Sequence, residues 1–63
     1  MTRDRAEREI KRIEAAIENA MIKIAEIRQY ADEYEGNAYE EISDINGYIR
    51  AMQVGLKRAY ACL

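Results

Sequence analysis

Tyrosine and arginine side chains are the groups in this chain best suited to binding chemistry. The chain has five tyrosines and ten basic residues, whereas histidine is absent. An arginine beside a tyrosine ring can stack on and neutralise an anion such as a nucleotide, and both residue types dominate binding hot spots. No glycine-rich phosphate loop accompanies them, so an anion site stays an alternative interpretation. The candidate anion contacts are Arg8, Arg12, Tyr48, Arg50, Arg58 and Tyr60.

The residue types that usually carry nucleophilic catalysis are nearly absent from this chain. Ser43 is the only serine and has no histidine to activate it, and Cys62, the only cysteine, lies near the C-terminus without a base. One thiol and no histidine also leave no ligand set for a structural zinc ion. We therefore expect no enzyme, no cofactor and no metal site.

Two patterns of apolar residues define the elements that carry these side chains. Residues 10–34 and residues 38–63 each place an apolar side chain at alternating spacings of three and four. Such heptad a/d spacing predicts two amphipathic helices. We expect an all-α, antiparallel two-helix hairpin, with helices at about 3–35 and 38–62, forming a single domain over residues 1–63.

The ends of both helices have recognisable capping residues. Gly36 is expected to take a left-handed conformation that ends the first helix, and Asn37 to cap the second. Thr2 or Asp4 is expected to cap the first helix, with Asp4 and Glu7 spaced as a capping box.

Reflecting one apolar pattern onto the other about Gly36 predicts the register of the hairpin. It places Ile13 opposite Ala59 and Ala20 opposite Met52. The first helix is then longer by about two turns. Its charged beginning, residues 2–9, is expected to fray or to project beyond its partner.

The short chain predicts self-association. A chain of 63 residues exposes much of its surface and usually needs disulfides, metal or oligomerisation to be stable. Isoleucine at both a and d positions favours three or four strands over two. We expect the hairpins to form a four-helix bundle or a larger homo-oligomer. The candidate core residues are Ile10, Ile13, Ile17, Ile24, Ile27, Ile42, Ile45, Ile49, Met52 and Leu56.

A second contact face is predicted outside these patterns. Small residues recur every four positions in the second helix, which lets another backbone approach closely. Apolar residues also occupy outer positions of both helices, beyond what one interface needs. The candidate partner face comprises Met21, Ile22, Gly47, Ala51, Val54 and Gly55.

Charge is distributed unevenly along the expected hairpin. The net charge of the chain is −2, but residues 1–12 carry +2 and residues 13–35 carry −4. The hairpin should therefore be basic where its termini meet and acidic toward its loop. This polarity is consistent with a solvated surface, with head-to-tail pairing of two hairpins, or with phosphate contacts at the basic end.

The predicted function is a non-enzymatic protein-interaction module, namely a regulator, adaptor or inhibitor of the kind that phages and mobile elements encode. The alternatives are nucleic-acid or nucleotide binding at the basic end and a purely structural oligomerisation module. No apolar stretch is long enough for a membrane span or a secretory signal. Because the lone thiol is unpaired, a reducing cytoplasm is the expected location.

Overall fold

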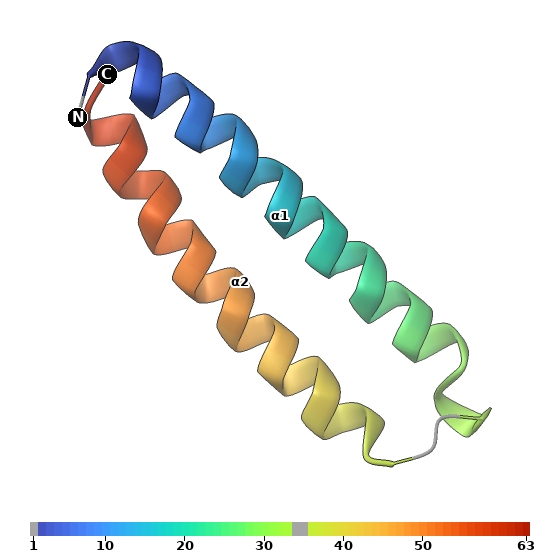
Figure 1. The fold of residues 1–63 in the computed structure, drawn as a ribbon. Helices are drawn as coiled ribbons and strands as arrows, with labels where there is room; N and C mark the ends of the chain where they lie inside the picture. Colours follow the sequence, from blue (N-terminus) through green and yellow to red (C-terminus); the bar gives the residue numbers. More distant parts are fainter. Residues whose placement is uncertain (1, 34–35) are drawn as a thin grey trace.

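The computed structural model describes residues 2–33 and 36–63 and confirms an all-helical hairpin. Helix α1 spans Arg3–Gln29, the short 3₁₀ helix η1 spans Ala31–Glu33, and helix α2 spans Ala38–Ala61. The two long helices run antiparallel and pack against each other along their length (Figure 1). The result is a rod of 46 × 14 × 11 Å.

Helix α1 begins at the first of its two predicted caps. The Thr2 hydroxyl accepts a hydrogen bond from the Arg5 backbone N–H at 3.3 Å. The capping-box prediction for Asp4 and Glu7 is wrong, because Asp4 already lies inside the first helical turn. There its carboxylate interacts favourably with the positive end of the helix dipole.

Helix α1 ends at Gln29, six residues before the predicted end at 35. The Tyr30 N–H still bonds to the Glu26 carbonyl at 3.1 Å, and the chain then tightens into η1. Asp32 and Glu33 explain the early end, because carboxylates are unfavourable at the negative C-terminus of a helix. The predicted seam member Tyr34 and the predicted end residue Glu35 lie outside the described residues.

Helix α2 begins as predicted. The Asn37 side-chain oxygen accepts a hydrogen bond from the Glu40 N–H at 3.1 Å. Gly36 has a φ of +117°, a conformation that side-chain-bearing residues rarely adopt. The left-handed turn predicted at Gly36 is confirmed, although it leads into α2 rather than directly ending α1.

The register differs from the predicted one by about one helical turn. A Cβ atom placed on Gly55 would lie 3.5 Å from Ile13 Cδ1, whereas Ala59 was the predicted neighbour. Ala20 lines a hollow together with Tyr48, which lies four residues before Met52, the predicted neighbour of Ala20. The difference at Ile13 amounts to four residues and follows from the early end of α1. The centre of the connection lies midway between residues 29 and 38 instead of at residue 36.

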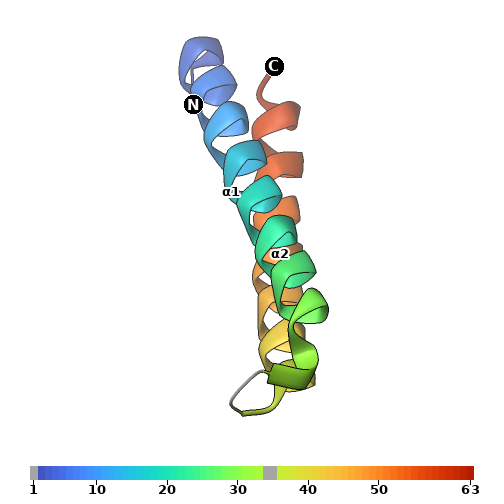
Figure 2. The ribbon, with the colours of Figure 1, turned by 90° about the vertical axis from the view of Figure 1, so that its right-hand side faces the viewer.

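The shifted register brings the beginning of α1 into contact with α2, although its charged side chains stay exposed. Ala6 has no exposed surface and Ala59 is 1% exposed, so the two helices approach closely near the termini. The prediction that residues 2–9 fray or project is therefore wrong. Figures 1 and 2 show the start of α1 and the end of α2 at the same end of the rod, and Figure 1 shows the two helices side by side. Within the described part of the chain, neither helix is long and apolar enough to cross a membrane.

Candidate interaction surface

The two helices bury their apolar seams unequally. In α1, Ile13 is 4% and Ile27 is 3% exposed, and Ile10 and Ile24 are buried as well, while Ile17 is half-buried. In α2, every large member of the seam remains half-buried. The packing of one helix on the other thus covers α1 but leaves α2 partly open. The half-buried seam residues of α2 are Ile42, Ile45, Ile49, Met52 and Leu56.

An apolar groove of about 320 Å³ follows one side of the contact between the helices. Isoleucines from both seams form its floor, and Met21, which is 60% exposed, stands on its rim. Arg28 is the one charged residue among those that line it. The residues that line this apolar groove are Ile17, Met21, Ile24, Ala25, Arg28, Asn46, Ile49 and Gln53.

The groove continues toward the loop. Arg28 also lines a second hollow, together with Ala31, Ala38, Tyr39 and Ile42. A partner helix lying in the apolar groove would therefore meet mostly apolar side chains as far as the start of α2.

The other side of the helix contact carries more charged residues. A hollow there is lined by Ala20, Lys23, Asp44, Ile45 and Tyr48, with Glu41 beside them. Helical geometry separates the two sides, because successive residues point about 100° apart. Charged side chains that must stay hydrated make this side a poorer place for an apolar partner.

The structure divides the predicted partner face. Met21 lines the apolar groove, whereas Ile22, 50% exposed, follows it and points away from the groove. Val54 is 52% exposed and lies between Gln53, which lines the groove, and Gly55, which faces Ile13. Its side chain therefore points outward.

The predicted stripe of small residues serves two separate environments. Gly55 lies in the contact between the helices, where its missing side chain leaves space for Ile13. Gly47 is exposed with no atom within 4 Å of an added Cβ, and Ala51 is also exposed. Of the six residues predicted for a partner face, only Met21 lines the apolar groove.

Sequence reasoning missed the polar rim of the groove. Asn46 and Gln53 line it, and both flank the heptad positions of α2. That flanking position was the available signal, because e and g residues border a coiled-coil seam. The four described tyrosines are exposed, and Tyr39 is the most exposed of them at 86%.

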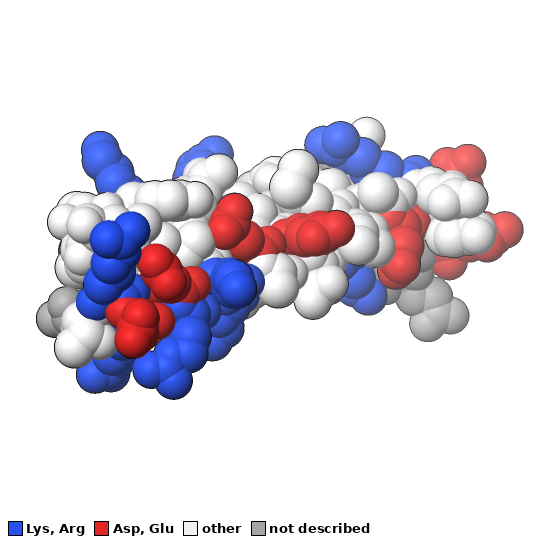
Figure 3. Space-filling model, turned by 90° about the horizontal axis from the view of Figure 1, so that it is seen from above, with Lys and Arg blue, Asp and Glu red and all other residues white. Residues whose placement is uncertain are grey.

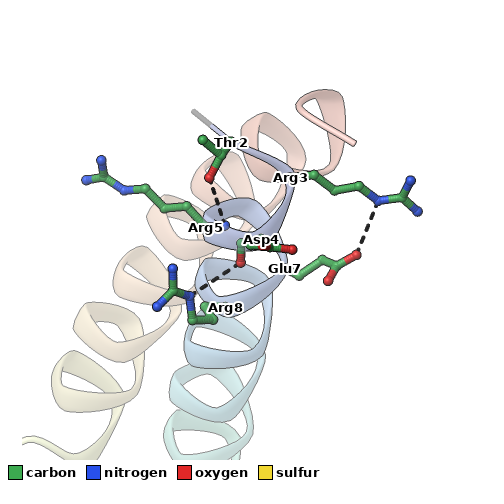
Figure 4. A network of polar contacts seen from close by, with 6 residues as sticks. All are labelled: Thr2, Arg3, Asp4, Arg5, Glu7 and Arg8. Carbon is green, nitrogen blue, oxygen red and sulfur yellow. Dashed lines mark hydrogen bonds and ion pairs between the residues drawn. The ribbon is translucent and has the colours of Figure 1, made fainter.

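The basic end carries both signs of charge. Figure 4 shows Arg3 paired with Glu7, at 3.3 Å, and Arg8 Nε donating to the Asp4 carbonyl at 3.5 Å. In Figure 3 a few acidic side chains sit among the basic ones at the left, terminal end. A hollow at this end is lined by Asp4, Glu7, Arg8 and Lys11, so it offers a bound anion as many carboxylates as cations.

The predicted anion contacts are spread over the hairpin. Arg8 and Arg12 lie in α1 and bond within their own helix, to Asp4 and Glu9. Among the described residues, no hydrogen bond or ion pair joins two of the six candidates, although Tyr48 lies near enough to Arg12 to contribute to the raised pKa of its guanidinium. Tyr48 also lines the hollow beside Lys23. The remaining candidates are the α2 residues Arg50, Arg58 and Tyr60.

One ion pair at this end changes the titration of its members. The hydrogen bond from Arg12 lowers the pKa of the Glu9 carboxyl below its ordinary value of 4.5; partial desolvation opposes this, and the charges of Arg12 and Arg5 add to it. The same bond raises the pKa of the Arg12 guanidinium.

We expect Arg12→Gln to return the pKa of Glu9 toward 4.5, measured by NMR titration of its carboxyl carbon. Arg5→Gln, the control, should move it less, because Arg5 acts only through its charge. The pKa of Glu9 is lower in the folded protein than in the unfolded chain. The ion pair therefore stabilises the fold at pH values above the unfolded pKa, and this stabilisation is lost as the pH falls through the folded pKa. Equal shifts in both variants would contradict this assignment.

Within the described residues, no three histidine, cysteine, aspartate or glutamate side chains converge on a point where a metal ion could bind. Comparisons with known protein families, with curated proteins and with solved structures found no match to this chain.

Proposed function

We propose that this hairpin is a non-enzymatic protein-interaction module that holds a partner helix in its apolar groove. The observation that carries the proposal is the half-buried seam of α2 beside the exposed rim residue Met21. Fully burying an exposed isoleucine or methionine side chain contributes about 1.5–3 kcal/mol, and the partly buried seam side chains leave a fraction of that free energy unrealised. A helix laid along the groove would recover that free energy, with Asn46 and Gln53 bonding at the rim.

A module of this kind acts as a regulator, adaptor or inhibitor. It needs no cofactor, because docking alone blocks or bridges the surface that it covers. We place it in the reducing cytoplasm, where the exposed thiol of Cys62 would stay unpaired.

Of the two alternatives, the first draws less support. Binding of nucleic acid or nucleotide at the basic end is disfavoured by the carboxylates interleaved with its arginines, since phosphate-binding surfaces are predominantly basic. A purely structural oligomerisation module would use the same groove, and differs only in having no partner besides its own copies.

Photo-crosslinking in cells tests the proposal. Benzoylphenylalanine at position 21, on the groove rim, is expected to give a covalent adduct with a partner protein that mass spectrometry identifies. The matched control is the same probe at Glu26, an exposed position of α1 that is absent from the groove lining, where no adduct is expected. A protein with no adduct at position 21, or equal adducts at both positions, would contradict the proposal.

A further inference from the structure

We propose that the occupant of the apolar groove is a second copy of this chain, running in the opposite direction, so that two hairpins form a two-fold symmetric four-helix bundle. The inference rests on the proposed function of the groove and names its partner. Three observations carry it: the open seam of α2, the surface area of the chain and the charges of its two ends.

The open seam has the spacing of a bundle core. Ile42 and Ile49 lie one heptad apart on the side of the groove and its continuation, and each remains half-buried in the hairpin. A second hairpin supplies a facing layer with the same periodicity. Isoleucine at both a and d positions also favours assemblies of more than two helices.

The exposed area of the chain leaves room for such an interface. The hairpin exposes 5151 Å². A compact monomer of 7.3 kDa would expose about 4,200 Å² by the usual scaling of surface with mass. The excess of about 1,000 Å² is close to the roughly 800 Å² that each partner buries in a stable interface of standard size.

The distribution of charge along the hairpin favours an antiparallel orientation of the second copy. In α2, all three acidic residues lie within 40–44 and all three basic residues within 50–58. In α1, residues 3–12 carry a net charge of +2 and residues 13–29 a net charge of −1, and Asp32 and Glu33 of η1 add two negative charges at the loop end. Both helices are therefore basic at the terminal end and acidic at the loop end, as Figure 3 shows for one face.

Antiparallel stacking places each basic end against the acidic end of the other copy. A parallel arrangement would bring two basic ends together and two acidic ends together, which is unfavourable. The antiparallel dimer is isologous, so it closes on itself and stops at two copies.

The first test is the mass in solution. Sedimentation equilibrium should give twice the 7.3 kDa mass of one chain. Met21→Asp, on the groove rim, should weaken the dimer by about tenfold or more, because it desolvates a carboxylate in an apolar contact. The control is Ile22→Asp, an equally apolar and exposed neighbour that points away from the groove, with little effect expected.

The second test reads the orientation from the single thiol. In the antiparallel dimer the two Cys62 residues lie at opposite ends of a rod 46 Å long, so a short bis-maleimide should not join them. Natural chain mixed with the Cys62→Ser, Asp32→Cys variant should instead give a crosslinked heterodimer, because residue 32 lies at the loop end. The control variant Cys62→Ser, Asp4→Cys carries its thiol at the terminal end and should give none.

The outcomes separate this inference from the proposed function. A monomer, a trimer or larger assembly, or efficient Cys62–Cys62 crosslinking in a dimer would overturn the antiparallel pair. If a monomer were accompanied by a photo-adduct with a different protein at position 21, the proposed function would stand and only its partner would change. Absence of any adduct together with a monomeric mass would overturn both.

Discussion

Replacing Ile27 by alanine is expected to destabilise the protein by about 2–5 kcal/mol, the range for isoleucine-to-alanine changes in a core. Ile27 is 3% exposed, the lowest value among the large side chains of the described core. A domain of this length has a total stability of about 3–9 kcal/mol, at roughly 0.05–0.15 kcal/mol per residue. The variant should therefore lose much of its helical content near room temperature.

Thermal unfolding followed by circular dichroism measures this effect. Ile22→Ala is the matched control, because it deletes the same atoms from a side chain that is 50% exposed, and we expect a change within about 0.5 kcal/mol. Both proteins must be compared at one concentration, since association stabilises the folded state. Similar losses for the two variants would show that Ile27 is not a core residue in solution.

Replacing Ala59 by leucine is expected to destabilise the hairpin by about 1–3 kcal/mol, the usual effect of overpacking. Ala59 is 1% exposed and Ala6 is fully buried near the same end, so no space remains for three more carbon atoms without moving the helices apart.

Urea unfolding of Ala59→Leu and of Ala61→Leu makes the comparison. Ala61 is exposed in the last turn of α2, and leucine has a similar helix propensity, so the control should unfold at nearly the same urea concentration as the natural protein. A stabilised Ala59→Leu variant would indicate an unfilled space between the helices at this end.

The architecture could be predicted from the sequence because its signals are local and periodic. Heptad spacing identified two helices, and the Gly36–Asn37 pair identified both the turn and the cap of α2. Each of these depends on a few neighbouring residues, which is the range over which side-chain chemistry dictates backbone conformation.

The register could not be predicted from the same pattern. A heptad repeat fits its partner almost equally well after a shift of one turn, so the alignment depends on the length of the connection. That length depends on where α1 ends, and Asp32 and Glu33 end it early although the apolar spacing continues through Ala31. The burial of Ala6 follows from this shift and has no signal of its own in a segment that is otherwise charged.

The candidate surface was predicted only in part for a related reason. Met21 was identified as an apolar residue outside the seam, but the sequence does not tell whether such a residue borders a groove or points outward like Ile22. The small residues were ambiguous in the same way. Gly55 proved to serve the packing of α2 on Ile13, whereas Gly47 has no neighbour in the hairpin.

The first and the last helical turns lie at the same end of the rod (Figure 1). This arrangement determines where a fused protein would be held. A protein fused to the first or to the last residue would sit at the same pole, and a short linker between the two ends would yield a circular permutant. In the proposed antiparallel pair, two such cargoes would be held at opposite poles, about 46 Å apart. The hairpin would then work as a molecular spacer.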